Sequence, residues 1–178
     1  VPSLGDNVWG MIPEVKEGSF DQSGIELRQD VLVYSTPPLQ KDIQVSGHVK
    51  IIMYLSSDVK DTDLTAKLVD VYPDGKAYNV AESIQRVRWR EGYAKPVFME
   101  KDEVYQVEIG PLITSNLFKK DHRIRLEISS SNFPRFERNL NTGGHNYDET
   151  DWKIATNRIH TGSGNPSRII LHVIDANQ

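Results

Sequence analysis

Apolar and polar residues alternate from Ile43 to Lys50, and apolar residues continue at the odd-numbered positions as far as Leu55. The odd-numbered positions carry apolar side chains or Gly47. The even-numbered positions up to residue 50 are polar, namely Gln44, Ser46, His48 and Lys50. A period of two places one set of side chains on each face of an extended strand, so this stretch predicts a half-buried β-strand. No segment shows a sustained helical period, and the one helical candidate is a short turn near residues 114–119. The pattern therefore predicts an all-β fold.

Further strand-like segments follow at short intervals, separated by turns rich in Gly and Pro. Pro73-Asp-Gly-Lys76 predicts a tight hairpin turn, because Pro fixes its own φ and Gly75 accepts a positive φ. About eight or nine strands in such an order predict a β-sandwich, most consistent with a jelly roll. The predicted strands besides 43–55 cover residues 31–34, 62–72, 77–81, 83–90, 104–109, 123–129, 153–159 and 168–174.

The chain is predicted to form one structural unit with two parts. Residues 1–30 are interrupted repeatedly by Gly and Pro and predict an irregular N-terminal arm, in which Trp9 and Met11 are apolar points. Residues 31–178 predict the jelly-roll domain, and a length of 178 residues suits a single domain. Because the chain begins at Val1 rather than methionine, we interpret it as a piece or a processed product of a longer protein, or as a chain with shifted numbering.

Composition argues against several classes of function. The formal net charge is −4 and the basic residues are scattered among acidic ones, which argues against a nucleic-acid partner. No apolar run approaches the length of a membrane span, so no membrane partner is expected. Cysteine is absent, which excludes disulfides, thiolate nucleophiles and Cys-ligated metals.

Catalytic signatures are also missing from the sequence. A serine hydrolase of the α/β type needs a Gly-x-Ser-x-Gly elbow, and the nearest feature, Gly162-Ser163-Gly164, has the wrong spacing. The five histidines lack metal-site spacing, and His160, before a Gly-rich turn, is more readily interpreted as structural than as catalytic. We therefore expect no catalytic residue and no cofactor in this chain.

Two segments remain as candidate binding sites. Asp58, Asp61 and Asp63 resemble a short acidic loop for Ca²⁺, although the loop lacks the Gly and closing Glu of an EF-hand, and Asp also caps turns. The segment from Ser129 to Gly144 mixes aromatic, basic and amide side chains in a polar loop. It predicts either a sugar platform or a loop clamped by Arg–carboxylate pairs, and the clamped loop is favoured. Its candidate ligand residues are Asn132, Phe133, Arg135, Phe136 and Asn139.

Arg86, Arg88 and Arg90 alternate with Val87 and Trp89. If the predicted strand 83–90 is continuous, the three guanidinium groups share one face of it. Such a row can bind anions, but it is more often a solvated face paired with acids.

Several ordered blocks of the chain resemble the C-terminal domain of one serine hydrolase family, that of cocaine esterase and X-prolyl dipeptidyl-peptidase (CocE/NonD). The most recognisable block runs from Ser56 to Gly75, around Leu64-Thr-Ala-Lys-Leu-Val-Asp-Val-Tyr-Pro-Asp-Gly75. The resemblance covers nearly the whole chain. The other matching blocks are Val1–Gly5, Val31–Leu39, Thr114–Phe118, His122–Leu126, Ser129–Gly144, Asn157–His160 and Pro166–Leu171.

The resemblance implies a non-catalytic jelly roll of the galactose-binding-like type. In this family an α/β-hydrolase domain carries a Ser-His-Asp triad, a helical cap is inserted in it, and members hydrolyse esters or amides. This chain lacks the triad, so its implied partners are the α/β-hydrolase and cap domains of its own parent chain. The resemblance also implies that Trp9 and Met11 line the substrate pocket. The alternative function is a carbohydrate-binding module that uses the Phe133–Asn141 loop.

Overall fold

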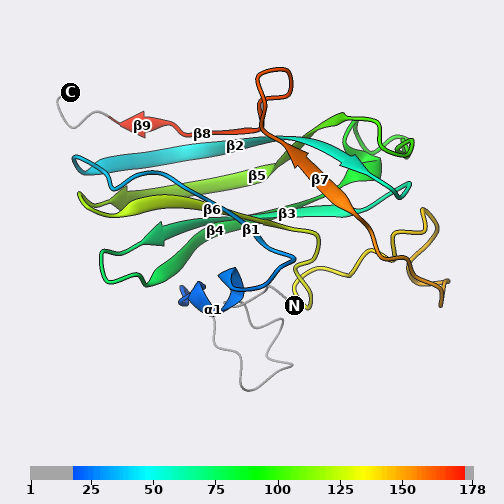
Figure 1. Cartoon of the computed structure of the whole chain (residues 1–178), viewed down its shortest axis with the longest axis horizontal. Helices are drawn as coiled ribbons and strands as arrows, with labels where there is room; N and C mark the ends of the chain where they lie inside the picture. The colour runs from blue at the N-terminus through cyan, green and yellow to red at the C-terminus, as the bar shows by residue number, and fades with distance from the viewer. Residues whose placement is uncertain (1–17, 175–178) are drawn as a thin grey trace.

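A computed structural model describes residues 18–174 as two antiparallel β-sheets packed face to face (Figure 1). The first sheet has the strand order β1-β6-β3-β4, and the second has β5-β2-β7 with β8 and β9 also paired to β2. The fold is therefore the predicted all-β jelly-roll sandwich. The strands are β1 (Leu32–Ser35), β2 (Ile43–Ser57), β3 (Asp63–Val71), β4 (Ala77–Arg86), β5 (Tyr105–Phe118), β6 (Arg123–Ser129), β7 (Asn157–His160), β8 (Arg168–Ile170) and β9 (Val173–Ile174).

Strand β2 organises the second sheet. It pairs with β5 from Ile43 opposite Phe118 to Leu55 opposite Tyr105, and its other edge pairs with β9, β8 and β7 in turn. The predicted alternation is confirmed, because the odd-numbered apolar side chains enter the core between the sheets. Those buried in this core are Val45, Val49, Ile51, Met53 and Leu55.

Strand β3 lies at the centre of the first sheet and is buried along its whole length. Leu64, Ala66 and Leu68 face the core between the sheets, which explains one set of buried side chains. The opposite set is covered from outside by residues 18–30, including helix α1 (Ser23–Glu26), and by the loop after β6. This outer cover places charged residues such as Lys67 away from solvent.

Several predicted elements differ in the structure. The helical turn near residues 114–119 is wrong: this segment is the end of β5, because it pairs with the first residues of the long strand β2. The segments 77–81 and 83–90 form one strand, β4, which ends at Arg86 and is followed by a 3-10 turn, η1 (Val87–Trp89). The predicted strand 153–159 is shorter in the structure, where the strand β7 covers only residues 157–160.

The three arginines therefore do not form a row on one strand face. The backbone turns at Val87, so that Arg88 is drawn into the protein and Arg90 lies over the ring of Tyr105 at 4.4 Å. The described part of the predicted arm also holds regular structure, namely α1 and a bridge between Asp21 and Tyr78. Trp9 and Met11 lie outside the described residues. Within those residues, no helix combines the length and apolar character that crossing a membrane requires.

Candidate functional site

The loop after β6 is fixed to the sandwich through the amide of Asn139. This buried side chain donates to Oδ2 of Asp61 at 2.7 Å and to Oδ1 of Asp63 at 2.9 Å. Two carboxylates, one just before β3 and one at its first residue, thus share one amide donor from a residue far along the chain. The arrangement positions the loop and brings two of the predicted calcium ligands together with one of the predicted sugar ligands.

Each of these two carboxylates is also paired with an arginine. Nε of Arg88 lies 2.7 Å from Oδ2 of Asp61, and Nε of Arg86 lies 2.9 Å from Oδ1 of Asp63. Burial raises the pKa of Asp63, while the hydrogen bonds from Arg86 and Asn139 act in the opposite direction. The site is therefore a closed ion-pair network, in which each carboxylate already has a cationic partner.

The third predicted calcium ligand lies apart from this network. Asp58 is exposed and accepts a hydrogen bond from the backbone N–H of Thr156 at 2.7 Å, which lowers the pKa of Asp58. Asp58 therefore caps the turn before β7 instead of joining Asp61 and Asp63. Among residues 18–174, no group of three or more His, Asp or Glu side chains is placed to hold a metal ion.

The other candidate ligand residues of the loop either contact Glu82 on β4 or lie at the surface of the protein. Asn132 is buried and donates to Oε2 of Glu82 at 2.9 Å, and Nη1 of Arg135 donates to Oε1 at 2.5 Å. Arg135 lies over the half-buried ring of Phe136 at 5.5 Å, whereas Phe133 is 48% exposed. Because both amides serve carboxylates inside the domain, this geometry supports the clamped-loop interpretation over a sugar platform.

A second buried charged cluster surrounds Lys67 on the outer face of the first sheet. Nζ of Lys67 donates to Gln22 at 2.9 Å and lies 3.9 Å from Oε2 of Glu82. Glu127 on the neighbouring strand β6 is 3% exposed, and burial raises its pKa to about 8. Sequence reasoning missed this cluster, although a lysine in the middle of the hydrophobic strand 62–72 was a signal for it.

One serine and one histidine form a hydrogen bond that resembles part of a hydrolase site. Oγ of Ser56 lies 2.9 Å from Nε2 of His160, where β2 pairs with β7. Ser56 is 3% exposed, and none of the described hydrogen bonds joins the other ring nitrogen of His160 to a carboxylate. A nucleophile needs both access and an oriented base, so this pair does not meet the requirements of a triad. Ser163 lies in the exposed turn after β7.

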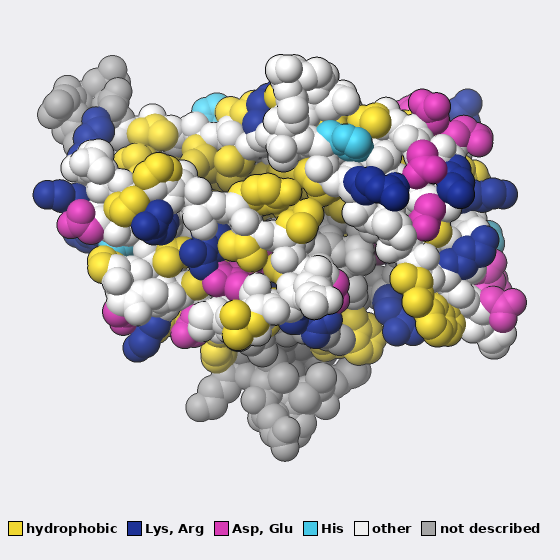
Figure 2. Space-filling view, viewed as in Figure 1, with side chains coloured by type: hydrophobic (Ala, Val, Ile, Leu, Met, Phe, Trp, Pro, Cys, Tyr) yellow, Lys and Arg dark blue, Asp and Glu magenta, His cyan; other side chains and the backbone are white. Residues whose placement is uncertain are grey.

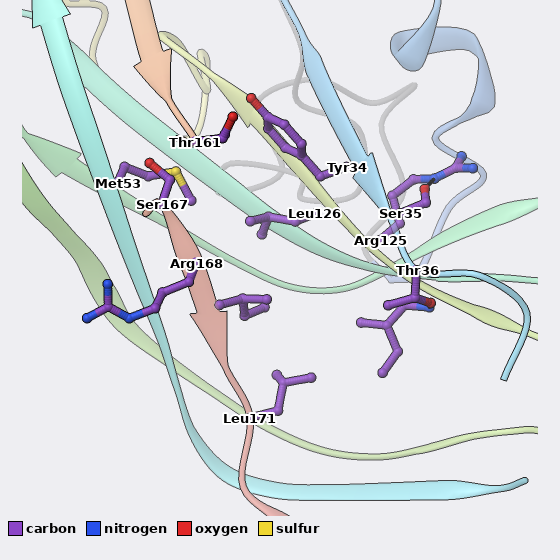
Figure 3. A pocket seen from close by; sticks show the side chains of 12 residues that line it. Tyr34, Ser35, Thr36, Met53, Arg125, Leu126, Thr161, Ser167, Arg168 and Leu171 are labelled. Atoms are coloured by element: carbon purple, nitrogen blue, oxygen red, sulfur yellow. Dashed lines mark hydrogen bonds between the residues drawn. The ribbon is translucent and has the colours of Figure 1, made fainter. Parts of the chain in front are cut away.

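A groove runs along the open edge of the sandwich between β1 and the β7–β8 side of the second sheet. Two hollows of about 250 and 310 Å³ lie along it, and we call them together the edge groove. Figure 3 shows Tyr34 and Leu126 from the first sheet and Met53 and Leu171 from the second around the smaller hollow. In Figure 2, hydrophobic side chains gather along the middle of this face. Sequence reasoning did not find this groove, because it forms from strands far apart in the chain.

Comparisons with known proteins agree with this architecture. Residues 10–170 match the family described as the X-Pro dipeptidyl-peptidase C-terminal non-catalytic domain. Cocaine esterase from Rhodococcus sp. (strain MB1 Bresler) is 45% identical over 176 residues, which make up 98% of this chain and 30% of that protein.

Two solved structures share the fold at 31% identity. An aminopeptidase from the marine sediment archaeon Thaumarchaeota archaeon has a TM-score of 0.82 over 88% of this chain and 28% of its own. An α-amino acid ester hydrolase has a TM-score of 0.82 over 87% of this chain and 27% of its own. The chain thus spans under a third of the length of each of these relatives. It belongs to the family of X-Pro dipeptidyl-peptidase C-terminal non-catalytic domains.

Proposed function

We propose that this chain is the accessory domain of an ester- or amide-cleaving serine hydrolase, where it packs on the catalytic domain and shapes the mouth of the active site. The observation that carries the proposal is the family match over residues 10–170, together with the 45% identity to a stretch that is only 30% of cocaine esterase. A non-catalytic domain attached to a hydrolase contributes by contact, because it has no reacting groups of its own.

The separate roles proposed for the domains follow from the catalytic groups that the described residues lack. Acyl transfer through an acyl-enzyme needs an exposed nucleophile, a base that reaches it and an orienting acid. In the Ser56–His160 pair the serine hydroxyl is buried, and among the described residues no acid orients the imidazole ring. The reaction therefore belongs to the α/β-hydrolase and cap domains of the parent chain, and this domain supplies packing surface.

Trp9 and Met11 are the residues proposed to reach the active-site mouth. The family resemblance implies that the arm around them runs beside the substrate pocket, where an indole and a thioether suit an apolar acyl or leaving group. The described end of the arm supports the proposal in one respect. Residues 18–30 are fixed to the first sheet through Gln22, so this end of the arm has a defined place on the sandwich.

The test is a chimera in which this chain replaces the matching 30% of cocaine esterase. We expect the chimera to hydrolyse ester, the esterase truncated at the same boundary to lose activity, and this chain alone to release no p-nitrophenol from a p-nitrophenyl ester. An inactive chimera, or full activity in the truncated esterase, contradicts a packing role. Hydrolysis by the isolated chain that disappears in Ser56→Ala or His160→Ala contradicts the non-catalytic assignment.

The mouth-shaping role is tested within the active chimera. Trp9→Ala and Met11→Ala should raise KM for substrates with bulky acyl groups more than for acetyl esters, while kcat changes little, because the lost contacts are made equally in the ground and transition states. Tyr147→Ala, at a side chain that is 87% exposed, is the control and should leave both constants unchanged. Equal KM values across the substrate series in the Trp9 and Met11 variants contradict the role.

A further inference from the structure

Strand β1 is an exposed edge strand without the features that protect such edges. It is the end strand of the first sheet, and all four of its residues are exposed. Its sequence, Leu32-Val-Tyr-Ser35, contains no charge and no proline, whereas natural edge strands usually carry one or the other to prevent pairing with other chains. An apolar edge of this kind is typical of a surface that another part of the protein covers.

The edge groove makes this surface concave. Leu32 and Tyr34 are paired with Ile128 and Leu126 of β6, so their side chains lie on the core side of the sheet and line the two hollows. Across the groove, Ile159 and Ile169 come from β7 and β8, which end the second sheet. The sandwich is thus incompletely closed here, and apolar side chains from outside can complete its core.

We infer that the edge groove is the docking surface for the catalytic part of the same polypeptide, which inserts apolar side chains between β1 and β8. This inference rests on the proposed function and specifies the surface that carries it. The relatives are more than three times as long as this chain, so a covalently attached partner of sufficient size exists in this family. Attachment also keeps that partner at a high effective concentration, so a modest apolar contact suffices for stable docking.

The rim of the groove indicates the charge of the inserted segment. Arg168 is exposed beside the smaller hollow, and in the described part of the chain its guanidinium has no carboxylate partner, only the carbonyl of Pro166 at 3.0 Å. Arg125, by contrast, is held by Glu26 at 2.5 Å. A docking segment with apolar side chains and an acidic residue next to them complements this surface.

A second copy of this chain fits the groove less well. A two-fold contact places the same patch against itself, so the hollows would face each other and leave unfilled volume between the copies. The catalytic part has no such restriction and can present a convex surface. A second copy in the groove is therefore an outcome that the test can detect and not the expected occupant.

The test uses single cysteines, because the chain contains none of its own. Tyr34→Cys places a thiol in the groove at a residue that is 38% exposed, and Tyr147→Cys places one on the loop after β6 at a residue that is 87% exposed. Each variant is prepared as the isolated chain and within the esterase chimera, and alkylation by a maleimide is timed. The chimera without an added cysteine gives the background rate.

We expect the alkylation of Tyr34→Cys to slow by at least about tenfold in the chimera relative to the isolated chain, while the rate for Tyr147→Cys changes by less than about twofold. Equal rates for Tyr34→Cys in the two forms, with the chimera active as an esterase, overturn the docking surface and leave the proposed function intact. An inactive chimera with neither thiol protected counts against both. A rate in the isolated chain that falls as its concentration rises assigns the groove to a second copy and overturns the inference.

A second pair of variants guards against local unfolding at Tyr34. Tyr34→Lys and Tyr147→Lys introduce the same cation at the two exposed tyrosines, and circular dichroism of the isolated chains checks that both fold. In the chimera, Tyr34→Lys should shorten the half-life of esterase activity on heating by at least about threefold relative to Tyr147→Lys, because a charge would be buried at the interface. Equal half-lives overturn the inference.

Discussion

Glu127 is a carboxyl group in surroundings that favour its protonated form. Its pKa is raised from an ordinary 4.5 to about 8, because burial and the neighbouring Glu26 raise it by more than Lys67 and Arg125 lower it. Between these two pKa values the folded protein binds a proton that the unfolded chain has released. The free energy of unfolding must therefore fall as pH rises from 4.5 to 8, and this group makes it depend little on pH below that window, where both states are protonated.

Glu127→Gln should remove this pH dependence. Glutamine resembles the protonated carboxyl in size and cannot ionise, so the variant should gain stability relative to the natural chain as pH rises, by up to about 1.4 kcal/mol per pH unit. Urea unfolding at several pH values between 5 and 8 measures this, since each midpoint and slope give a free energy of unfolding.

The control for this prediction is Glu108→Gln. Glu108 is exposed on β5 and pairs with Lys50 at 2.8 Å, so its replacement removes the same charge from the surface of the other sheet. We expect the stability profile of this variant to run parallel to that of the natural chain. Parallel profiles for both variants would show that Glu127 ionises as readily in the folded protein as in the unfolded chain.

At the scale of single elements, the hairpin between β3 and β4 depends on one glycine. Gly75 has φ of +91°, and its N–H donates to the carbonyl of Tyr72 at 2.9 Å in the turn predicted from Pro73-Asp-Gly-Lys76. Gly75→Val should lower the free energy of unfolding by about 1 to 3 kcal/mol, because a β-branched residue is strained in this region. Chemical denaturation measures the loss.

Gly164→Val provides the matched control for the hairpin variant. Gly164 lies in the exposed turn after β7, does not have a positive φ, and an added Cβ would meet no atom within 4 Å. The substitution should change the free energy of unfolding by less than about 0.5 kcal/mol. A loss as large as that of Gly75→Val would attribute both effects to β-branching in a loop and not to the positive φ.

Local sequence signals predicted most strands and failed where long-range pairing decides. The alternation of Ile43–Leu55 and the turn at Pro73–Lys76 are local features, and both are confirmed. Residues 114–119 gave no strand signal of their own, and they extend β5 because β2 offers a partner over the same length. Arg88 illustrates the opposite error. The alternating residues around it suggested a strand up to residue 90, but β4 ends at Arg86 and the 3-10 turn η1 follows.

At the scale of the whole molecule, the family signal was readable while the contacts that define each site were not. Blocks of residues in a fixed order indicated the family, because the order of the blocks can be read directly along the sequence. The sharing of Asn139 between Asp61 and Asp63 joins residues 78 and 76 positions apart, and the edge groove joins β1 to β8. Spacing within the sequence carries no information about such pairs. The predicted calcium loop was plausible for that reason, since its arginine partners were not visible.

The response of the whole molecule to calcium tests that loop. A cation that binds only the folded state raises the melting temperature by mass action. Asp61 and Asp63 already have Arg88, Arg86 and Asn139 as partners, so a Ca²⁺ ion would have to displace these donors. We therefore expect calorimetric melting of the isolated chain to give the same temperature in excess chelator and in millimolar calcium.

Arg88→Gln is the informative variant for the same experiment. It removes the cation beside Asp61, so the molecule should melt at a lower temperature, because a buried carboxylate loses its ion pair at a cost of several kcal/mol, about 3 to 5. If carboxylate pairing by arginine is what excludes the metal, calcium should restore part of this loss in the variant only. A calcium-dependent rise of several degrees in the natural chain would instead show that the aspartates bind the ion despite their arginine partners.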